Sequence, residues 1–307
     1  MLVLAIVSAI AIFGPTGVGK TAVAIELAEL LRARGEHPLA ISADALQVYS
    51  GLETLTGAAT DHERSRLEHR LISIVPVTET FSAGRFAALA HSEIDAALET
   101  GRTPIVVGGT GLYLQAALTD LELRPPPPPG LRERIERDVE ERGLEAVHAE
   151  LAERAPAAAK RIEPADRTRV IRSLELLEMG EDPVGSRSRL WTANLRHPTV
   201  LCGLTIDLPA LYERIDARVN ALVAAGAAEE VQRAAAAGAS PTARKALGFD
   251  ELLRGDVEAM KRRTRNYARR QLTWMRRLEG ITVLDAGTAT PRELAKRLES
   301  ARPKPCQ

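Results

Sequence analysis

The sequence predicts an α/β fold with a parallel sheet flanked by helices, on three observations. Short apolar runs alternate with amphipathic helical patterns through the first third of the chain, which is typical of βαβ units. The first apolar run, residues 3–13, leads directly into a glycine-rich turn and then into a helical pattern. The 307 residues, 45% hydrophobic and 27% charged, suffice for a sizeable core, which excludes a disordered or fibrous protein.

Local signals support each predicted element. The run 3–13 is too short for a membrane span and lacks the charged flank of a signal peptide, so we expect a buried parallel strand there. Ser82 is the expected N-cap of a helix that stops at Gly101. In chain order, we expect strands at 3–13, 39–42, 104–107, 200–206 and 281–284, and helices at 20–34, 82–100, 208–225, 227–237 and 260–278.

A run of five prolines at 125–129 marks a stiff connection, because proline fits neither a helix interior nor a central strand. The pattern at 131–177 is helical and rich in charge. We therefore predict three parts: an α/β core at 1–124, a helical insertion at 125–199, and a part at 200–307 in which a returning strand and basic helices complete the core.

The cysteine content points to a reducing, cytoplasmic setting. Cys202 and Cys306 lie far apart, which is typical of neither a disulfide framework nor a metal cluster. No run is long enough to suggest a membrane partner.

The turn after the first strand fits the phosphate-loop pattern G-x-x-x-x-G-K-[ST] completely. Its glycines let backbone N–H groups converge on phosphate oxygens, Lys20 supplies a mobile charge, and Thr21 is the candidate ligand of Mg²⁺. The predicted phosphate contacts are Gly14, Pro15, Thr16, Gly17, Val18, Gly19, Lys20 and Thr21. The pattern predicts a P-loop NTPase-like sheet and leaves open whether the loop binds a diphosphate or a nucleotide such as ATP.

The acidic residue expected of a conventional ATPase is absent from its usual place. The strand at 104–107 ends in Gly108, Gly109, Thr110 and Gly111, with no carboxylate at its tip. Asp44 instead follows the second strand, at the carboxyl edge where open α/β sheets bind ligands. Three interpretations of Asp44 stay open: a metal-associated carboxylate, a general base, or a helix N-cap.

Beyond this loop the chain resembles the tRNA dimethylallyltransferases, also called isopentenyl-diphosphate:tRNA transferases, over nearly its whole length. The matching segments occur in family order at 14–21, 42–49, 107–116, 168–175, 211–231, 243–249 and 264–277. The resemblance implies transfer of a dimethylallyl group from its diphosphate to N6 of adenosine 37, beside the anticodon, in tRNAs that read codons beginning with U. The loop would then hold a prenyl diphosphate, and no attacking water would need an acid.

Roles for individual residues follow from the resemblance. Asp44 matches the family's catalytic aspartate, which accepts or orients the N6 proton. Thr110 matches a residue that hydrogen-bonds near the base and the diphosphate, and the glycines beside it allow close backbone approach. The expected contacts of the departing diphosphate are Thr16, Lys20 and Arg218, with Mg²⁺ as the cofactor at Thr21.

Two of these positions need comment. Arg218 is alternatively a solvated helix arginine, although neither Arg214 nor Leu222, one turn away, is an acid that could pair with it. The surrounding family pattern R-I-D-x-R favours the diphosphate contact. The family segment D-I-G-T-A-K-P reads Glu53-Thr54-Leu55-Thr56-Gly57-Ala58-Ala59 here, and the serine after the aspartate is Ala45, so no role can rest on that lysine or that hydroxyl.

An adenine in the anticodon stack must be extruded to reach a carboxylate at a sheet edge, so the resemblance also implies contacts with the surrounding loop nucleotides. In that case the insertion at 125–199 binds tRNA. The predicted tRNA contacts are Asp44, Ala45, Leu46, Gln47, Thr110, Arg132, Thr168, Arg169, Val170, Ile171, Arg172, Arg244, Lys245, Ala246, Leu247, Gly248, Phe249, Arg269 and Arg270.

Charge is distributed unevenly along a chain whose formal net charge is zero. Residues 1–159 carry a net charge of −8 and residues 160–277 a net charge of +7. Residues 260–277 hold eight bases and no acid, whereas an ordinary solvated helix mixes both signs. We therefore expect the basic helix to contact an RNA backbone, and its Tyr267 and Trp274 to be packing residues.

Two other functions remain open from the sequence. A P-loop small-molecule kinase shares the loop, the sheet and the Mg²⁺ site. A nucleotide-gated RNA-binding module without chemistry uses the basic helix but leaves Asp44 and Thr110 without a role. We expect a monomer that binds the tRNA anticodon stem-loop and dimethylallyl diphosphate.

Overall fold

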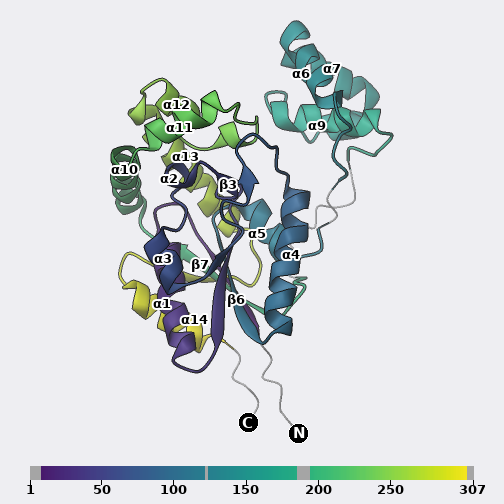
Figure 1. Cartoon of the computed structure of the whole chain (residues 1–307). Coiled ribbons are helices and arrows are strands. Elements are labelled where there is room, and N and C mark those ends of the chain that lie inside the picture. The colour runs from purple at the N-terminus through teal and green to yellow at the C-terminus, as the bar shows by residue number, and fades with distance from the viewer. Residues whose placement is uncertain (1–7, 122–123, 185–193, 303–307) are drawn as a thin grey trace. The chain divides into compact units, whose positions relative to one another are not determined.

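The structure, a computed structural model, describes residues 8–121, 124–184 and 194–302. Contacts divide the chain into two compact units (Figure 1). The first consists of Met1–Leu121 and Leu190–Gln307, and the second is Glu122–Arg189, which overlaps the insertion predicted at 125–199 but begins three residues and ends ten residues earlier. Each unit is described by itself.

A six-stranded sheet forms the centre of the first unit. Its strands are β1 (Ala9–Phe13), β2 (His37–Ser42), β4 (His69–Arg70), β6 (Arg102–Gly108), β7 (Thr199–Thr205) and β8 (Thr282–Asp285), in the order β4-β2-β6-β1-β7-β8. All neighbouring strands are parallel; Ile10 of β1, for example, lies opposite Ile105 of β6 and Val200 of β7. Every residue of β1 is buried, as expected of a central parallel strand covered on both faces.

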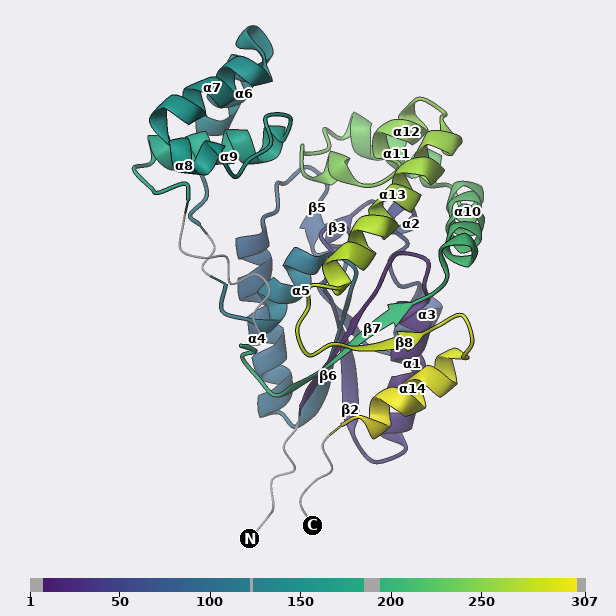
Figure 2. The same ribbon diagram turned by 180° about the vertical axis from the view of Figure 1, so that it is seen from behind.

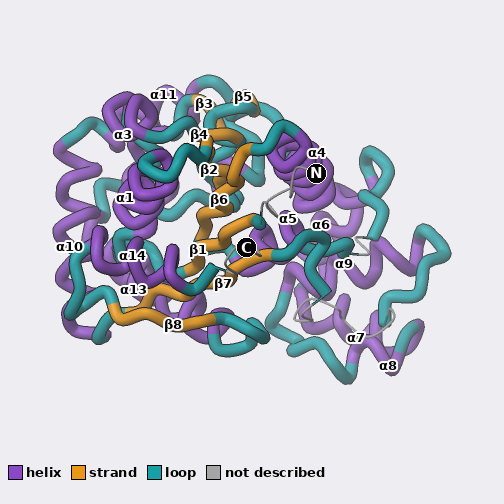
Figure 3. Tube along the Cα trace, turned by 90° about the horizontal axis from the view of Figure 1, so that it is seen from below, coloured by secondary structure: helices purple, strands orange, loops and turns teal. Residues whose placement is uncertain are grey.

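Helices cover both faces of this sheet. Helices α1 (Lys20–Arg32), α3 (Asp61–Arg66) and α14 (Pro291–Ser300) lie on one side of it, and α4 (Ala83–Glu99) and α5 (Gly111–Leu118) on the other (Figure 3). Helix α1 buries Val23, Leu27 and Leu31, whose spacing of four residues makes one apolar face. The α/β class with a P-loop-like parallel sheet is thereby confirmed.

A group of helices lies at the end of the sheet where β1 and β2 finish. It comprises α2 (Glu53–Thr56), α10 (Leu208–Ala224), α11 (Ala227–Ala236), the 3₁₀ turn η1 (Ala243–Lys245), α12 (Phe249–Leu253) and α13 (Val257–Met275) (Figure 2). The small parallel pair β3 (Tyr49–Ser50) and β5 (Val75–Pro76) lies beside α2 (Figure 1). Loops and helices are therefore brought together above the carboxyl ends of the strands.

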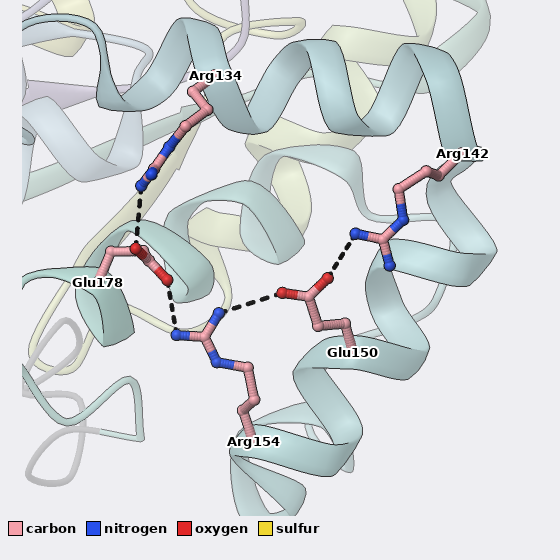
Figure 4. A network of polar contacts seen from close by, with 5 residues as sticks. All are labelled: Arg134, Arg142, Glu150, Arg154 and Glu178. Atoms are coloured by element: carbon pink, nitrogen blue, oxygen red, sulfur yellow. Dashed lines mark hydrogen bonds and ion pairs between the residues drawn. The ribbon is translucent and has the colours of Figure 1, made fainter.

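The second unit is helical. It contains α6 (Leu131–Arg142), α7 (Leu144–Arg154), α8 (Pro156–Ala159) and α9 (Arg167–Glu178), packed around a small apolar core that includes Ile135, Leu151 and Val170. A chain of ion pairs links α6, α7 and α9: Arg134 to Glu178, Glu178 to Arg154, Arg154 to Glu150 and Glu150 to Arg142 (Figure 4).

Predicted and observed elements differ mainly at their ends. The strand predicted at 3–13 begins at Ala9, with residues 1–7 outside the described part. The basic helix begins at Val257, three residues before the predicted start, because Asp256 accepts a hydrogen bond from the N–H of Ala259 and caps it. Within the described residues no helix is long and apolar enough to cross a membrane. Cys202 is buried with a free thiol, and Cys306 lies outside the described residues.

Candidate active site

A cavity of about 540 Å³ opens at the carboxyl end of the sheet in the first unit. Its lining comes from the glycine-rich loop 14–21, the turn after β2, α2, the end of β6, α10 and α13. Lys20, Thr21, Asp44 and Arg218 are among the lining residues. The predicted phosphate contacts Lys20 and Thr21, the candidate base Asp44 and the distant Arg218 therefore line the same cavity.

Lys20 folds back over the glycine-rich loop. Its Nζ donates to the carbonyl oxygens of Gly14 and Pro15, each at 3.0 Å. Burial lowers the pKa of Lys20 to about 8, against the opposing effect of the nearby Asp44 carboxylate. The amine is therefore held where an anion in the loop would meet a positive charge without competing water.

Asp44 lies in the turn after β2, at the edge of the cavity. Its Oδ1 accepts hydrogen bonds from the N–H groups of Leu46 at 2.9 Å and Gln47 at 3.4 Å, which fixes the turn after β2. The residue also lines the cavity, with Lys20 and Arg218 close enough to feel its charge. The helix N-cap interpretation is therefore wrong, because a turn at 45–48 and not a helix follows Asp44. The metal-associated and general-base interpretations stay predictions.

Arg218 is not a solvated surface arginine. Its Nη2 donates to the carbonyl oxygens of Thr56 at 3.2 Å and Gly57 at 3.4 Å, and burial lowers the pKa of the guanidinium. Gly57 has φ +56°, and a methyl group there would collide with Nη2. The altered segment 53–59 therefore forms the seat of Arg218, so the surface interpretation of this arginine is wrong.

Tyr267 lines the cavity, whereas Thr110 does not line it and contacts it only through the hydroxyl group of Tyr267. Thr110 precedes α5 and its Oγ1 lies 3.1 Å from Oη of Tyr267 on α13. Burial and the charge of Asp44 raise the pKa of Tyr267, which keeps the phenol neutral and able to donate. Tyr267 also packs edge-on against Trp274 at 6.2 Å between ring centroids, so it is both a packing residue, as predicted, and a cavity residue.

Gln271 is the residue of this site that sequence reasoning missed. It is 1% exposed, accepts a hydrogen bond from the N–H of Thr16 at 2.9 Å and donates to the carbonyl oxygen of Gly109 at 2.7 Å. A methyl group on Gly109 would collide with its amide, so the close approach to this glycine is made by a side chain of the protein, and an approach to the base or the diphosphate stays a prediction. Its position four residues after Tyr267, on one face of α13, is the only sequence signal that could have singled it out.

The predicted tRNA contacts of the first unit occupy different environments. Gln47 lines the cavity, but its amide bonds the hydroxyl of Ser42 and the carbonyl of Gly57 and so braces the wall. Phe249 is buried, with the exposed guanidinium of Arg244 above its ring. Ala45 and Leu46 are partly exposed, Gly248 and Ala246 are buried, Leu247 lines the cavity, and Lys245, Arg269 and Arg270 are exposed.

In the second unit the predicted contacts divide in the same way. Arg132 and Arg172 both pair with the fully buried carboxylate of Glu175, at 2.9 and 2.8 Å. The side chains of Val170 and Ile171 are enclosed in the apolar core and hold α9 in place. Thr168 and Arg169 are exposed. Of this segment, only the polar side chains at its surface are free to meet a ligand.

The basic helix is less uniformly free than its sequence suggests. Lys261 pairs with Glu258 on the same helix, Arg263 with Glu251 of α12, and Arg265 with Asp216 of α10. The exposed bases of this stretch are Arg262, Arg269, Arg270, Arg276 and Arg277. Among the described residues, no cluster of three His, Cys, Asp or Glu side chains could hold a metal ion by itself.

A family model described as IPP transferase matches residues 47–278. The chain belongs to the IPP transferase family. It is 42% identical over 278 residues to a tRNA dimethylallyltransferase of Rhodospirillum centenum, covering 86% of each chain. It is 41% identical over 301 residues to a tRNA dimethylallyltransferase of Anaeromyxobacter dehalogenans, covering 93% of this chain and 97% of the relative.

Solved structures agree with this assignment. The full-length tRNA isopentenylpyrophosphate transferase from Bacillus halodurans matches with a TM-score of 0.68 and 31% identity, over 96% of this chain and 95% of that chain. A eukaryotic dimethylallyltransferase acting on tRNA matches with a TM-score of 0.75 and 26% identity, over 96% of this chain and 80% of that chain. This IPP transferase is therefore an enzyme of the prenyltransferase type, as the resemblance implied. The model's match begins at 47, so roles for the glycine-rich loop and Asp44 depend on the cavity itself.

Proposed function

We propose that the chain transfers a dimethylallyl group from dimethylallyl diphosphate to N6 of adenosine 37 in tRNAs that read codons beginning with U. The observation that carries this proposal is the convergence of Lys20, Arg218 and Asp44 in one cavity, in a member of the IPP transferase family. Two cations beside one carboxylate match the charges of a departing diphosphate and an attacking amine. The products would be N6-dimethylallyladenosine in tRNA and inorganic diphosphate.

Lys20 and Arg218 would stabilise the leaving diphosphate as its bond to the dimethylallyl group breaks. As the allylic C1–O bond opens, the diphosphate oxygen takes the electron pair, and negative charge grows on the leaving group. Lys20 and Arg218 are both partly buried beside the glycine-rich loop, where their charges are less screened than at an open surface. The loop's backbone N–H groups and the start of α1 at Lys20 add positive potential toward the same point.

Asp44 and Thr110 would assist formation of the bond between N6 of the adenine and C1 of the dimethylallyl group. The N6 lone pair attacks C1, and the nitrogen then loses one proton, which we assign to the Asp44 carboxylate. Oγ1 of Thr110 lies 3.1 Å from the hydroxyl of the cavity residue Tyr267, and we assign to Thr110 a hydrogen bond to the base or the diphosphate. Because the turn after β2 fixes Oδ1 of Asp44, the base does not have to be positioned by the substrate.

The residues fit a Mg²⁺ ion that comes with the diphosphate. Thr21 and Asp44 both line the cavity and offer hard oxygen ligands, and Mg²⁺ is commonly held by one or two such groups together with substrate phosphates and water. When bound, the ion would offset charge on the diphosphate oxygens. We therefore propose Thr21 as its protein contact.

The tRNA would meet exposed basic side chains in each unit. On α13, Arg269 and Arg270 are exposed beside the cavity residue Tyr267, and Arg244 and Lys245 are exposed on η1. In the second unit, Arg169 is exposed at the start of α9. Such side chains suit an RNA backbone and unstacked loop bases. The proposed substrates place the reaction in the cytoplasm.

The decisive experiment incubates the protein with dimethylallyl diphosphate, Mg²⁺ and a tRNA carrying adenosines at 36 and 37. We expect a mass gain of one dimethylallyl group at adenosine 37, found by nucleoside mass analysis. No gain with folded protein contradicts the proposal. ADP release from ATP that depends on a small acceptor would indicate a kinase instead, and salt-sensitive tRNA binding without a modified base would indicate an RNA-binding module.

A further inference from the structure

The side chain of Gln271 connects three segments that are distant in sequence. Its Oε1 accepts the hydrogen bond from the N–H of Thr16, 255 residues away, and its Nε2 donates to the carbonyl oxygen of Gly109, 162 residues away. Both bonds are short, at 2.9 and 2.7 Å, and the side chain is 1% exposed. One amide thus ties the glycine-rich loop, the turn after β6 and helix α13 together.

The two ends of this amide are not interchangeable. The Thr16 N–H needs an acceptor and the Gly109 carbonyl needs a donor, which a glutamine supplies from a single side chain. Loss of either bond would leave a polar group of the protein without a partner in a buried site, which is unfavourable. Gly109 is also required, because a methyl group there would collide with Nε2. Breaking either hydrogen bond, or adding a side chain at Gly109, is therefore unfavourable, and the connection favours one arrangement of the three segments.

The helix that carries Gln271 also carries proposed RNA contacts. Arg269 and Arg270 directly precede it and are exposed. Tyr267, one turn earlier, lines the cavity and contacts Thr110. Gln271 is thus a direct hydrogen-bonded connection between the helix that carries the proposed RNA contacts and Thr16 of the glycine-rich loop.

We propose that Gln271 is a positioning residue that couples the binding of the two substrates. Gln271 already bonds the Thr16 N–H and the Gly109 carbonyl in the free protein, and RNA that restricts the motion of α13 restricts the glycine-rich loop with it, in the arrangement that binds the diphosphate. The inference rests on the function proposed above. Because coupling is a free energy, the diphosphate strengthens RNA binding by the same factor.

The test measures the dissociation constant of inorganic diphosphate with Mg²⁺, with and without saturating anticodon stem-loop RNA. The proteins compared are the wild type, Gln271→Ala, and the control Gln232→Ala on the exposed side of α11. We expect RNA to tighten diphosphate binding about fivefold or more in the wild type and the control, and less than about twofold in Gln271→Ala. Equal dissociation constants with and without RNA in the wild type, or undiminished coupling in Gln271→Ala, overturn the inference.

A second variant, Gln271→Glu, serves where the alanine variant does not fold. A protonated glutamic acid can still accept from Thr16 and donate to Gly109, whereas the ionised form cannot donate. Burial raises the pKa of a carboxyl group at this site, so coupling is expected at low pH and is lost as pH rises through that pKa. Coupling in Gln271→Glu that does not change with pH contradicts the inference. Failure of the proposed function is distinguishable, because the wild type would then not prenylate tRNA at all.

Discussion

At the scale of single residues, Asp44 shows how an anchored side chain keeps its chemistry. The bonds from Leu46 and Gln47 to Oδ1 fix the carboxylate without neutralising it. An asparagine can accept the same bonds through its carbonyl oxygen but has no basicity. Position and proton transfer can therefore be separated at this residue.

We predict that Asp44→Asn lowers kcat by about 10²–10⁴-fold, the usual contribution of a general base, and leaves tRNA affinity near the wild-type value. Asp44→Ala should lose both the base and the hydrogen bonds that fix the turn after β2, and so lose additional stability of about 1 kcal/mol. Single-turnover prenylation and tRNA titrations measure the two effects. The matched control is Asp61→Asn on the exposed surface of α3. Full turnover by Asp44→Asn would remove Asp44 from the base role.

Lys20 gives the site a dependence on alkaline pH. Its amine must be charged to hold a diphosphate, and burial lowers its pKa to about 8. We expect the KM for dimethylallyl diphosphate to rise by up to about tenfold per pH unit above this value. A KM that stays flat to about pH 9.5 would contradict this assignment.

The sign of the stability change separates this effect from unfolding. Because the pKa of Lys20 is lowered on folding, the unfolded chain binds more protons between about pH 8 and its ordinary value of 10.5. Loss of this proton therefore raises the free energy of unfolding. A Lys20→Arg variant, which stays charged, should bind dimethylallyl diphosphate more weakly, with a higher KM that does not change with pH over this range.

Only part of the site could be predicted residue by residue. Lys20, Asp44 and Thr110 belong to local patterns at strand ends, and the structure brings them to one cavity or its rim. Gln271 bonds partners 255 and 162 residues away, a relation that no local pattern contains. The seat of Arg218 on Gly57 is hidden for the same reason, since it depends on how α10 packs on α2.

At the scale of elements, periodic patterns predicted the long strands and helices, and their ends were off by a few residues. The central strands at 104–107 and 200–206 and the helix at 20–34 correspond to β6, β7 and α1. The two-residue strands β3, β4 and β5 and the four-residue helix α2 were missed, because so few residues show no periodicity. Helices α3, α5, α12 and the ten-residue α14 were not predicted either. Yet α2 and its loop build the wall of the cavity that holds Arg218.

Substitution of Gly57 in this wall tests whether contact with Arg218, rather than backbone strain, is what matters for activity. In Gly57→Ala, the new methyl group must displace the Arg218 guanidinium, so we expect a higher KM for dimethylallyl diphosphate and a lower kcat, each by about tenfold or more. Gly51→Ala is the control, because its φ of +89° imposes the same backbone strain of about 1–2 kcal/mol while nothing lies within 4 Å of the added methyl group.

Steady-state kinetics and thermal melts distinguish the two variants. Both are expected to lose comparable stability, and only Gly57→Ala to lose activity. Similar kinetics for the two would show that Arg218 does not need its seat on Gly57.

At the scale of the whole molecule, the formal net charge of zero conceals an arrangement that suits a polyanion. The basic stretch 160–277 includes α13, where three bases are paired with acids of α10, α12 and α13 itself. Those pairs hold the helices together, and the exposed bases that remain face solvent. The number of usable charges is therefore smaller than the sequence count suggests.

Location, not total charge, should decide RNA affinity. We predict that replacing Arg269 and Arg270 by Gln weakens tRNA binding and reduces the slope of log Kd against log salt concentration by about 1–2. The control replaces Lys296 and Arg297 by Gln, which removes the same net charge. Both side chains are exposed on α14, and this helix lies on the α1 side of the sheet (Figure 3). Because electrostatic attraction falls off within about 10 Å at 0.1 M salt, the control slope should stay at the wild-type value. Equal losses in both double variants, measured by tRNA titration over a salt series, would show that α13 is not the contact surface.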